Sequence, residues 1–378
     1  MADSPAPLLR SSASTLLGPS AASSNNTSSS LLPALSEKKS VERSRVFAVF
    51  EEQAMSPGWK INETAVKGMF DLLLCMITQK KTPLAAWRSL IKVGEHGDCI
   101  GIKVATESGI LSGTHRELVK IIVQELREAG VKPEKMIVWD RRRRDLEKAG
   151  YFHLSGVNLQ WVEQGIGYDP KTTFYSPIIG QLVYGDLEFR EAPHSFQQWL
   201  DHTQQQFSNE SHYAMLLSKH LDKIINIPSL CDSTYSGVHG ALANMTLDVI
   251  DNWRRFTKSP YFGSPAIADL YAKEFISGKV ILTVMDGLTL EYAGGPGPNP
   301  SHTIAYGALF ASRDPVAIDA TAVRLIDEQR CIANLPKLGG KEEHLLAAEA
   351  AGLGNAEEEK IELVRVSVNN RESQKGRL

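Results

Sequence analysis

Short apolar runs alternate with amphipathic helical segments along most of the chain, and this alternation predicts an α/β fold. The expected strands are rich in branched and aromatic residues, as in Val46-Phe-Ala-Val-Phe50. The predicted strands are residues 45–50, 99–104, 135–140, 223–228, 279–285, 303–311 and 361–368. Because helical segments separate most of these strands, we expect mainly parallel sheets with flanking helices.

Several helix starts are marked by side chains that can accept a hydrogen bond from the first turn. Asn62, Thr82 and Asp314 each precede a helical segment, and the last two are followed by proline. Thr114 and Glu117 have the spacing of a capping box. Further helices are predicted over residues 211–222, 238–256 and 342–351, and after Ser264-Pro265.

The clearest supersecondary unit is a strand, a helix and a second strand between residues 99 and 140. Such a crossover is right-handed and joins parallel strands, so both carboxyl ends should lie at one edge of the sheet. Lys103 and Asp140 lie at these two ends. Lys103 interrupts an otherwise apolar strand, and a buried lysine needs a carboxylate or an anionic ligand as its partner.

The chain divides into three regions by composition. Residues 1–42 are rich in serine and alanine without apolar periodicity, so we expect a disordered tail. A short polar tail is expected at the C-terminus, over residues 371–378. The α/β region between them is residues 43–370, and its two expected lobes around a cleft are residues 43–210 and 211–370.

The charge balance argues against some classes of function. Charged residues make up 22% of the chain and the formal net charge is -3, so a nucleic-acid partner is not expected. No apolar run reaches the roughly 20 residues of a membrane-spanning helix, so no membrane partner is expected. The basic run Arg141–Arg144 is interpreted as a solvated helix start or loop, with anion binding as the alternative. A cytoplasmic location is expected, and export is left open.

The cysteines include one candidate metal ligand. Cys75, Cys99, Cys231 and Cys331 contain no C-x-x-C pair, so no iron–sulfur cluster or zinc ribbon is expected. Cys231 differs because it follows a strand, precedes a polar loop and is adjacent to an aspartate. The thiol and carboxylate of Cys231 and Asp232 could bind a soft or borderline divalent metal, and Asp286 is the third candidate ligand.

An acidic residue and a glycine-rich loop follow the strand at 279–285. Asp286 ends this strand, and Gly294, Gly295 and Gly297 lie in the loop. We expect Asp286 to face a ligand or a metal, and the alternative is an Asx turn. The glycines would let a ligand approach backbone amides, or would form a rigid surface turn.

Two further aspartates lie at the start of the next helix. Asp314 fits a helix cap best, with ligand binding as the second reading. Asp319 is about one turn further along and faces either the site or a neighbouring helix. Both are kept as candidate ligand-binding residues.

His239 lies at the expected start of a helix, after a polar loop. Helix N-termini attract anions and histidine is a common acid–base residue, although a lone histidine is usually structural. Asn244 follows about one turn later and would share the same helix face as a ligand-binding residue. The expected catalytic residues are therefore His239, Asp286 and Lys103.

Three segments keep the order and spacing of a known family. They are residues 101–140, 224–244 and 286–319, and the stretch 347–354 is similar to that family's C-terminal end. Together they resemble the widespread bacterial and archaeal family known as domain of unknown function 362. The resemblance covers most of the chain from about residue 95 and implies a redox context, so an external redox partner is expected.

The chain departs from this family in the second segment. Family members usually carry lysines and a histidine after the proline, whereas this chain has Ser229, Cys231, Asp232 and Ser233 there, and Ala243 replaces another lysine. The family's frequent four-cysteine module is also missing. Whether the altered loop retains the family's activity is left open.

Two functions fit these residues. The first is an enzyme acting on a small anionic or polar metabolite, with a divalent metal as a conceivable aid. In it, Lys103 and the helix start near His239 supply positive potential, while Asp286 and Asp232 hold a cation or move a proton. The second is a non-catalytic protein that binds an anion or a cofactor through the glycine-rich loop. Both readings require a small-molecule ligand.

Overall fold

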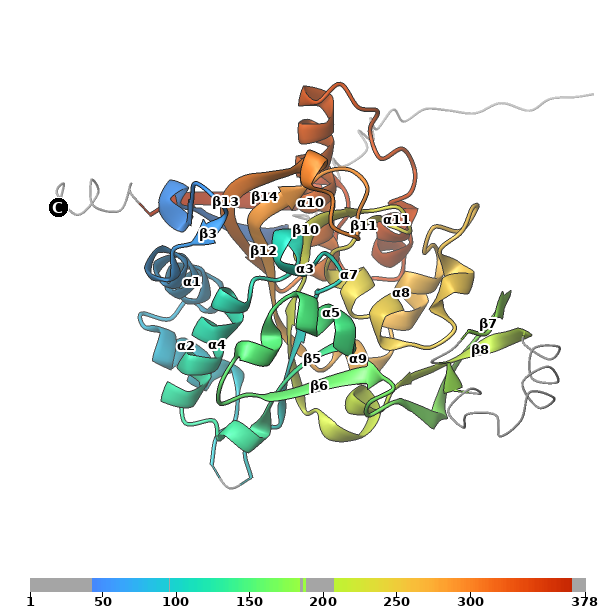
Figure 1. Cartoon of the computed structure of the whole chain (residues 1–378), viewed down its shortest axis with the longest axis horizontal. Helices are drawn as coiled ribbons and strands as arrows, with labels where there is room; N and C mark the ends of the chain where they lie inside the picture. Colours follow the sequence, from blue (N-terminus) through green and yellow to red (C-terminus); the bar gives the residue numbers. More distant parts are fainter. Residues whose placement is uncertain (1–42, 95, 184–185, 188–206, 369–378) are drawn as a thin grey trace, which may run out of the picture. The chain divides into compact units, whose positions relative to one another are not determined.

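The computed structural model describes residues 43–94, 96–183, 186–187 and 207–368 (Figure 1). All of these residues belong to one compact unit that begins at residue 42. The tails expected at 1–42 and 371–378 lie outside the described residues. None of the helices in the described ranges combines the length and the apolar character that crossing a membrane requires.

A ten-stranded sheet forms the centre of this unit. Its main path runs through β14 (Ile361–Ser367), β1 (Ser44–Phe50), β13 (Thr303–Ser312), β12 (Val280–Glu291), β9 (Lys223–Ile227), β4 (Ile100–Val104), β5 (Met136–Arg142) and β6 (Asn158–Glu163). Beside this path, β10 (Ser229–Ser233) pairs with β12 and with β11 (Gly237–Val238). Neighbours along the path are parallel, except that β13 is antiparallel to β1 and to β12. The predicted class, α/β with a mainly parallel sheet, is confirmed.

Helices cover both faces of the sheet (Figure 1). One face packs against α1 (Glu63–Thr78), α2 (Pro83–Leu90) and α4 (Arg116–Glu128). The other face packs against α7 (Ala241–Asn244), α8 (Ala266–Tyr271), α10 (Pro315–Ile332) and α11 (Glu343–Ala350). Because side chains alternate along a strand, the isoleucines of β4 are buried against the first layer, whereas Lys103 faces the second. This alternation places the lysine on the side of α7.

Shorter elements lie in the connections. They are α3 (Gly109–Ser112), α5 (Arg143–Lys148), α9 (Glu274–Ser277), and two small antiparallel pairs, β2 (Met55–Ser56) with β3 (Lys60–Ile61) and β7 (Tyr168–Gln181) with β8 (Phe207–Ala214). The two lobes expected at 43–210 and 211–370 share the central sheet, since β9 pairs directly with β4. The boundary between them stays a prediction.

Three of the predicted helix caps are confirmed. The side chain of Asn62 accepts from the first turn of α1, and that of Thr82 from the first turn of α2. Asp314 caps α10. The capping box at Thr114 is wrong, because α4 begins one residue later and Thr114 Oγ1 donates to the carbonyl oxygen of Ile227 at 2.6 Å. A buried acceptor on a neighbouring strand competes successfully with the local cap.

Two predicted helices are also wrong. Residues 211–222 form the end of β8 and a π-helical turn at Leu216–His220. In residues 238–256, Val238 ends β11, and the helical elements are only the four-residue α7 and two 3₁₀ turns. The backbone leaves the helical conformation at Thr246 and again at Ile250, whose φ angles are -129° and -124°.

Replacing Asp314 with alanine should destabilise the protein by about 1–3 kcal/mol. Asp314 Oδ1 accepts from the N–H groups of Val316 and Ala317, both at 2.8 Å, and Oδ2 accepts from Ser44 Oγ at 2.5 Å. The carboxylate therefore caps α10 and ties it to β1. Glu328→Ala, at an exposed position on the same helix, is the control. Urea unfolding of both variants measures the difference, and equal losses would show that the cap contributes little.

Candidate functional site

Beside β4, the chain switches from adding strands on one side of the sheet to adding them on the other side. The chain continues from β4 to β5 and β6 on one side, whereas β9 pairs with β4 on the other side and adjoins β12. The helices that follow β4 and β9 lie on opposite faces of the sheet. In parallel α/β sheets, ligands bind at such a switch point, beyond the carboxyl ends of the strands. The carboxyl ends of β4, β5 and β9 therefore mark the candidate site.

The loop that joins β4 to α4, residues 105–115, supports the polar groups at this edge. Four of its side chains contact buried groups on other strands. These contacts are Thr106 with Asp140, Ser108 with Cys231, Ser112 with Glu291, and His115 with Asp286. One loop therefore positions acidic and thiol groups that are far apart in the sequence.

Lys103 is fully buried, and each of its three donors has an acceptor. Its Nζ lies 2.6 Å from Asp140 Oδ1, 2.7 Å from Asn244 Oδ1 and 2.8 Å from the carbonyl oxygen of Val104. The expected carboxylate partner of the buried lysine is thus Asp140. Because an ammonium group has three donors, Lys103 orients its neighbours and has none left for a ligand.

His239 lies between β11 and α7 and is only 7% exposed. Its Nε2 lies 2.8 Å from Asp248 Oδ2, and Arg141 Nη1 lies 3.1 Å from Asp248 Oδ1. Lys103 Nζ is 3.8 Å from the same carboxylate. The structure therefore gathers three predicted site residues, Lys103, His239 and Asn244, around Asp140 and Asp248. We name this group the lysine–histidine cluster.

The charges of this cluster favour a protonated imidazole. Burial lowers the pKa of His239, but the neighbouring Asp248 more than offsets this, and the pKa is raised above its ordinary value. Burial alone would raise the pKa of Asp248, yet His239 and Arg141 hold it well below its usual range. Asp248 therefore remains an anion. Within the described part of the chain, no hydrogen bond engages His239 Nδ1.

Asp286 lies inside β12 and not at a strand end, because β10 pairs alongside and extends the strand to Glu291. Its Oδ2 accepts from the backbone N–H of His115 at 2.7 Å and lies 3.0 Å from His115 Nδ1. Its Oδ1 accepts from the N–H of Leu288 at 3.1 Å, a bond of the Asx-turn type. Asp286 therefore faces a histidine and not the other predicted metal ligands.

We expect the His115–Asp286 pair to make stability depend on pH. Burial lowers the pKa of His115, but Asp286 outweighs this effect and raises the pKa above its ordinary value. A raised folded-state pKa contributes stability that is complete below the unfolded value, about 6.5, and is lost as pH rises through the folded pKa. From about pH 6 to pH 8, the unfolding free energy of the wild type should fall by roughly 1 kcal/mol more than that of Asp286→Asn. Urea titrations at both pH values test this, and parallel losses contradict it.

Cys231, Asp232 and Glu291 form a second group, which we name the thiol–carboxylate cluster. Their potential ligand atoms all lie within 4.8 Å of one another, and all three residues are buried. Cys231 and Glu291 are register partners on the adjacent parallel strands β10 and β12. Ser112 Oγ donates to Glu291 Oε2, and Ser108 Oγ lies 3.8 Å from Cys231 Sγ. The third potential metal ligand beside Cys231 and Asp232 is therefore Glu291, and not Asp286 as predicted.

Burial raises the pKa of all three groups of this cluster. The pKa of Glu291 is raised to about 7, chiefly by burial and also by the charge of Asp232, while the hydrogen bond from the Ser112 hydroxyl opposes the shift. Burial also raises the pKa of Asp232, against the backbone amides that it accepts from. The pKa of the Cys231 thiol is raised well above its ordinary value by burial and then by Glu291.

The glycine-rich loop contacts this cluster directly. The N–H groups of Gly295 and Gly294 donate to Asp232 Oδ1 at 2.8 Å and Oδ2 at 3.1 Å. A Cβ on Gly295 would lie 2.7 Å from Cys231 Sγ, which is too close for any side chain. Gly297 is different, because a Cβ there would meet no atom within 4 Å. The loop's amides therefore bind a carboxylate of the protein itself.

Asp319 and Asp314 have structural partners. Asp319 accepts from the N–H groups of Ala241 at 2.6 Å and Leu242 at 2.9 Å, so it occupies the start of α7. The anion that was expected at the helix start near His239 is thus this carboxylate. Asp314 lies at the other edge of the sheet, because β13 runs antiparallel to β12. A ligand-binding role for either aspartate stays a prediction.

Four residues of the site were missed by the sequence reading. His115 was hidden by the capping box, Asp248 by a predicted helix, and Glu291 by the early end assigned to its strand. Arg141 belonged to a basic run that was interpreted as solvated, but it is buried and its guanidinium lies 4.2 Å from the centre of the Trp253 ring. For Arg141, Asp248 and Glu291, the sequence signal was a charged residue within or just after an apolar run, whereas His115 has no such signal.

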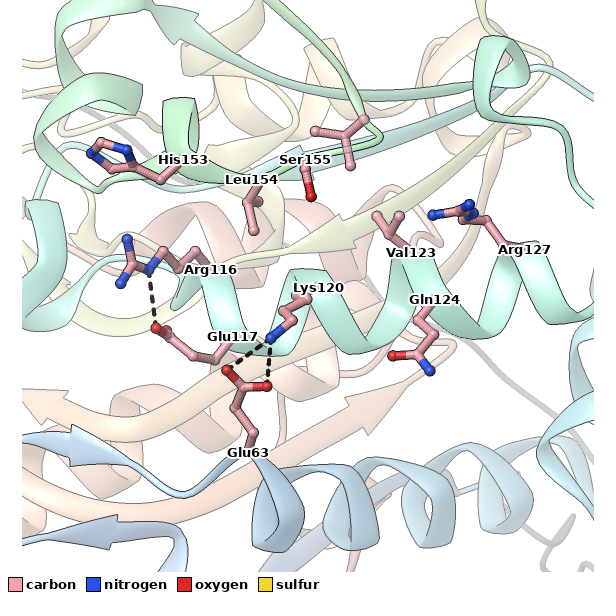
Figure 2. A pocket seen from close by; sticks show the side chains of 11 residues that line it. Glu63, Arg116, Glu117, Lys120, Val123, Gln124, Arg127, His153, Leu154 and Ser155 are labelled. Atoms are coloured by element: carbon pink, nitrogen blue, oxygen red, sulfur yellow. Dashed lines mark hydrogen bonds and ion pairs between the residues drawn. The ribbon is translucent and has the colours of Figure 1, made fainter.

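Two open grooves lie away from the predicted site residues. One, of about 620 Å³, follows α4, and Figure 2 shows two ion pairs among its side chains. There, Lys120 Nζ lies 2.7 Å from Glu63, and Arg116 Nε lies 3.0 Å from Glu117. The other groove, of about 760 Å³, is lined by the exposed part of the basic run, 142–144, and by Trp161. Neither groove brings buried titratable side chains together as the carboxyl edge of the sheet does.

Comparison with known proteins supports the resemblance inferred from the motifs. The model of the family described as Domain of unknown function (DUF362) matches residues 188–324, so the resemblance to this family is confirmed. A search of curated proteins finds no match. Among solved structures, the chain is similar to a structural-genomics crystal structure of a Thermotoga maritima protein, with 14% identity and a TM-score of 0.38. The match covers 73% of this chain and 60% of that one.

Proposed function

We propose that this chain is an enzyme acting on a small anionic or polar metabolite at the carboxyl edge of its sheet. The supporting observation is the 2.8 Å contact between His239 Nε2 and Asp248 Oδ2, beside the buried cations Lys103 and Arg141. A histidine held by a carboxylate is suited to general acid–base catalysis. His239 would be the group that moves a proton.

The division of roles follows from the contacts. Asp248 fixes the ring at Nε2 and stabilises its protonated form, so Nδ1 is the atom that would exchange a proton with the metabolite. Lys103 is a positioning residue in this proposal, because its three donors are engaged within the protein. Its charge still adds positive potential, which attracts an anionic ligand. Asn244 helps to hold the ammonium group in place.

A ligand screen with turnover assays tests this proposal. Thermal unfolding is measured with phosphorylated, carboxylated and neutral polar metabolites, and every compound that stabilises the protein is assayed for conversion. We expect an anionic compound to raise the melting temperature by at least about 2 °C, because it binds only the folded state. Turnover should fall at least about 100-fold in His239→Gln.

The control for this screen is His153→Gln, because His153 is exposed and lies on the α4 groove. Unchanged turnover in His239→Gln would contradict the proposed role of the ring. Tight binding without any turnover would favour the non-catalytic alternative, a protein that holds an anion or a cofactor. An external redox partner remains a prediction from the family resemblance.

A further inference from the structure

We propose that Cys231, Asp232 and Glu291 bind one divalent metal ion of the zinc class. This inference concerns the thiol–carboxylate cluster and does not depend on the acid–base role proposed for His239. The ligand atoms of the three side chains lie within 4.8 Å of one another, so a single ion could contact all of them. All three residues are at most 3% exposed.

The strand pairing explains how the ligands meet. Cys231 and Glu291 are register partners on β10 and β12, and Asp232 follows Cys231 in the chain. Two backbone amides of the glycine-rich loop hold the Asp232 carboxylate, at 2.8 and 3.1 Å. The cluster is therefore fixed by sheet hydrogen bonds and by a loop, as a preformed metal site requires.

A second observation points to a missing cation partner. Glu291 Oε1 is buried without a hydrogen-bond partner among the residues that the structure describes. Arg330 Nη1 lies 3.9 Å from Asp232 Oδ2, on the other carboxylate of the cluster. A buried carboxylate oxygen without a partner is costly, and a metal ion would satisfy it. The same ion would neutralise the second carboxylate and the thiolate.

The donor set selects the class of metal. A thiolate favours soft and borderline ions, whereas Mg²⁺ and Ca²⁺ prefer oxygen ligands throughout. Zinc accepts both sulfur and carboxylate oxygen, and catalytic zinc sites commonly use three protein ligands with a fourth position open. The hydroxyl groups of Ser108 and Ser112 lie beside Cys231 and Glu291, where they can orient the ligands.

Metal titration of the whole protein tests this site. Protein stripped with a chelator is titrated with Zn²⁺, and bound metal is counted by mass spectrometry after desalting. Co²⁺ serves as a spectroscopic substitute, because a thiolate ligand gives an intense near-ultraviolet charge-transfer band. We expect one equivalent of metal, the thiolate band, and affinities at least about tenfold lower in Cys231→Ser and Glu291→Gln.

Two control variants separate this site from other sources of binding. Cys331→Ser removes an exposed thiol, and Asp286→Asn removes a carboxylate that faces His115. Both should bind one metal like the wild type. His239→Gln should also bind normally, so a failure of the acid–base proposal would leave this result unchanged.

The proposal is overturned if no metal binds, if the thiolate band is missing, or if Glu291→Gln binds like the wild type. Glu291→Gln is nearly isosteric and keeps an acceptor for Ser112, so it tests the site even if Cys231→Ser does not fold. Circular dichroism of each metal-free variant establishes that it is folded before titration.

Discussion

Replacing Lys103 with methionine should destabilise the folded protein by about 3–5 kcal/mol. The lysine is fully buried, and its removal leaves the carboxylate of Asp140 buried without its cation at 2.6 Å. Asn244 would also lose its donor. Methionine has a similar length, so the loss would reflect charge and hydrogen bonding more than lost volume. Urea unfolding monitored by circular dichroism measures the change.

The matched control is Lys120→Met. Lys120 pairs with Glu63 at 2.7 Å, but the two side chains are 53% and 49% exposed, so this ion pair should contribute less than about 1 kcal/mol. A double variant, Lys103→Met with Asp140→Leu, should recover part of the loss because no buried charge is then left unpaired. If Lys103→Met lowers the unfolding free energy no more than Lys120→Met does, the charges of the buried cluster do not stabilise the fold.

Gly240→Ala should cost at least about 3 kcal/mol and disturb the site as well. A Cβ at Gly240 would lie 2.0 Å from Asp319 Oδ1 and 2.4 Å from its Cγ, so the carboxylate must move away. That movement breaks its bonds to the N–H groups at the start of α7. His239 is the preceding residue, and the variant should therefore also weaken ligand binding.

Gly297→Ala provides the control for this glycine. Its Cβ would meet no heavy atom within 4 Å, so we expect a change below about 0.5 kcal/mol. Thermal and urea unfolding of both variants give the comparison. Equal stability of Gly240→Ala and the wild type would mean that Asp319 does not occupy the start of α7 as the structure places it.

The sequence predicted much of the fold because the decisive signals are local. The caps at Asn62, Thr82 and Asp314 depend on a side chain and the two or three residues after it, and all three occur in the structure. The parallel pairing of β4 and β5 likewise follows from one crossover. The cap predicted at Thr114 was wrong because its hydroxyl donates to a strand more than a hundred positions away, and such a contact has no local sequence signal.

The site was only partly predictable for the same reason. Lys103 was identified because a lysine in an apolar strand requires a partner, and Asp140 lies at the end of the adjoining strand. Asp286 was predicted as the third metal ligand beside Cys231 and Asp232, but the structure places Glu291 there. The local sequence does not show that β12 continues to Glu291 and pairs with β10. Asp248 meets His239 through irregular turns that replace a predicted helix. Contacts of this kind depend on the tertiary fold.

The central claim, that His239 is the reactive group of a ligand site, is tested most directly by NMR of its ring nitrogens. Protein labelled with ¹⁵N-histidine is titrated with the best ligand of the screen, and His239→Gln assigns the signals. We predict that Nδ1 of His239 shifts with saturation while Nε2, bonded to Asp248, changes less. The signals of exposed His153 should not move. A ligand that stabilises the protein and shifts other histidines, but leaves both nitrogens of His239 unchanged, would contradict the claim.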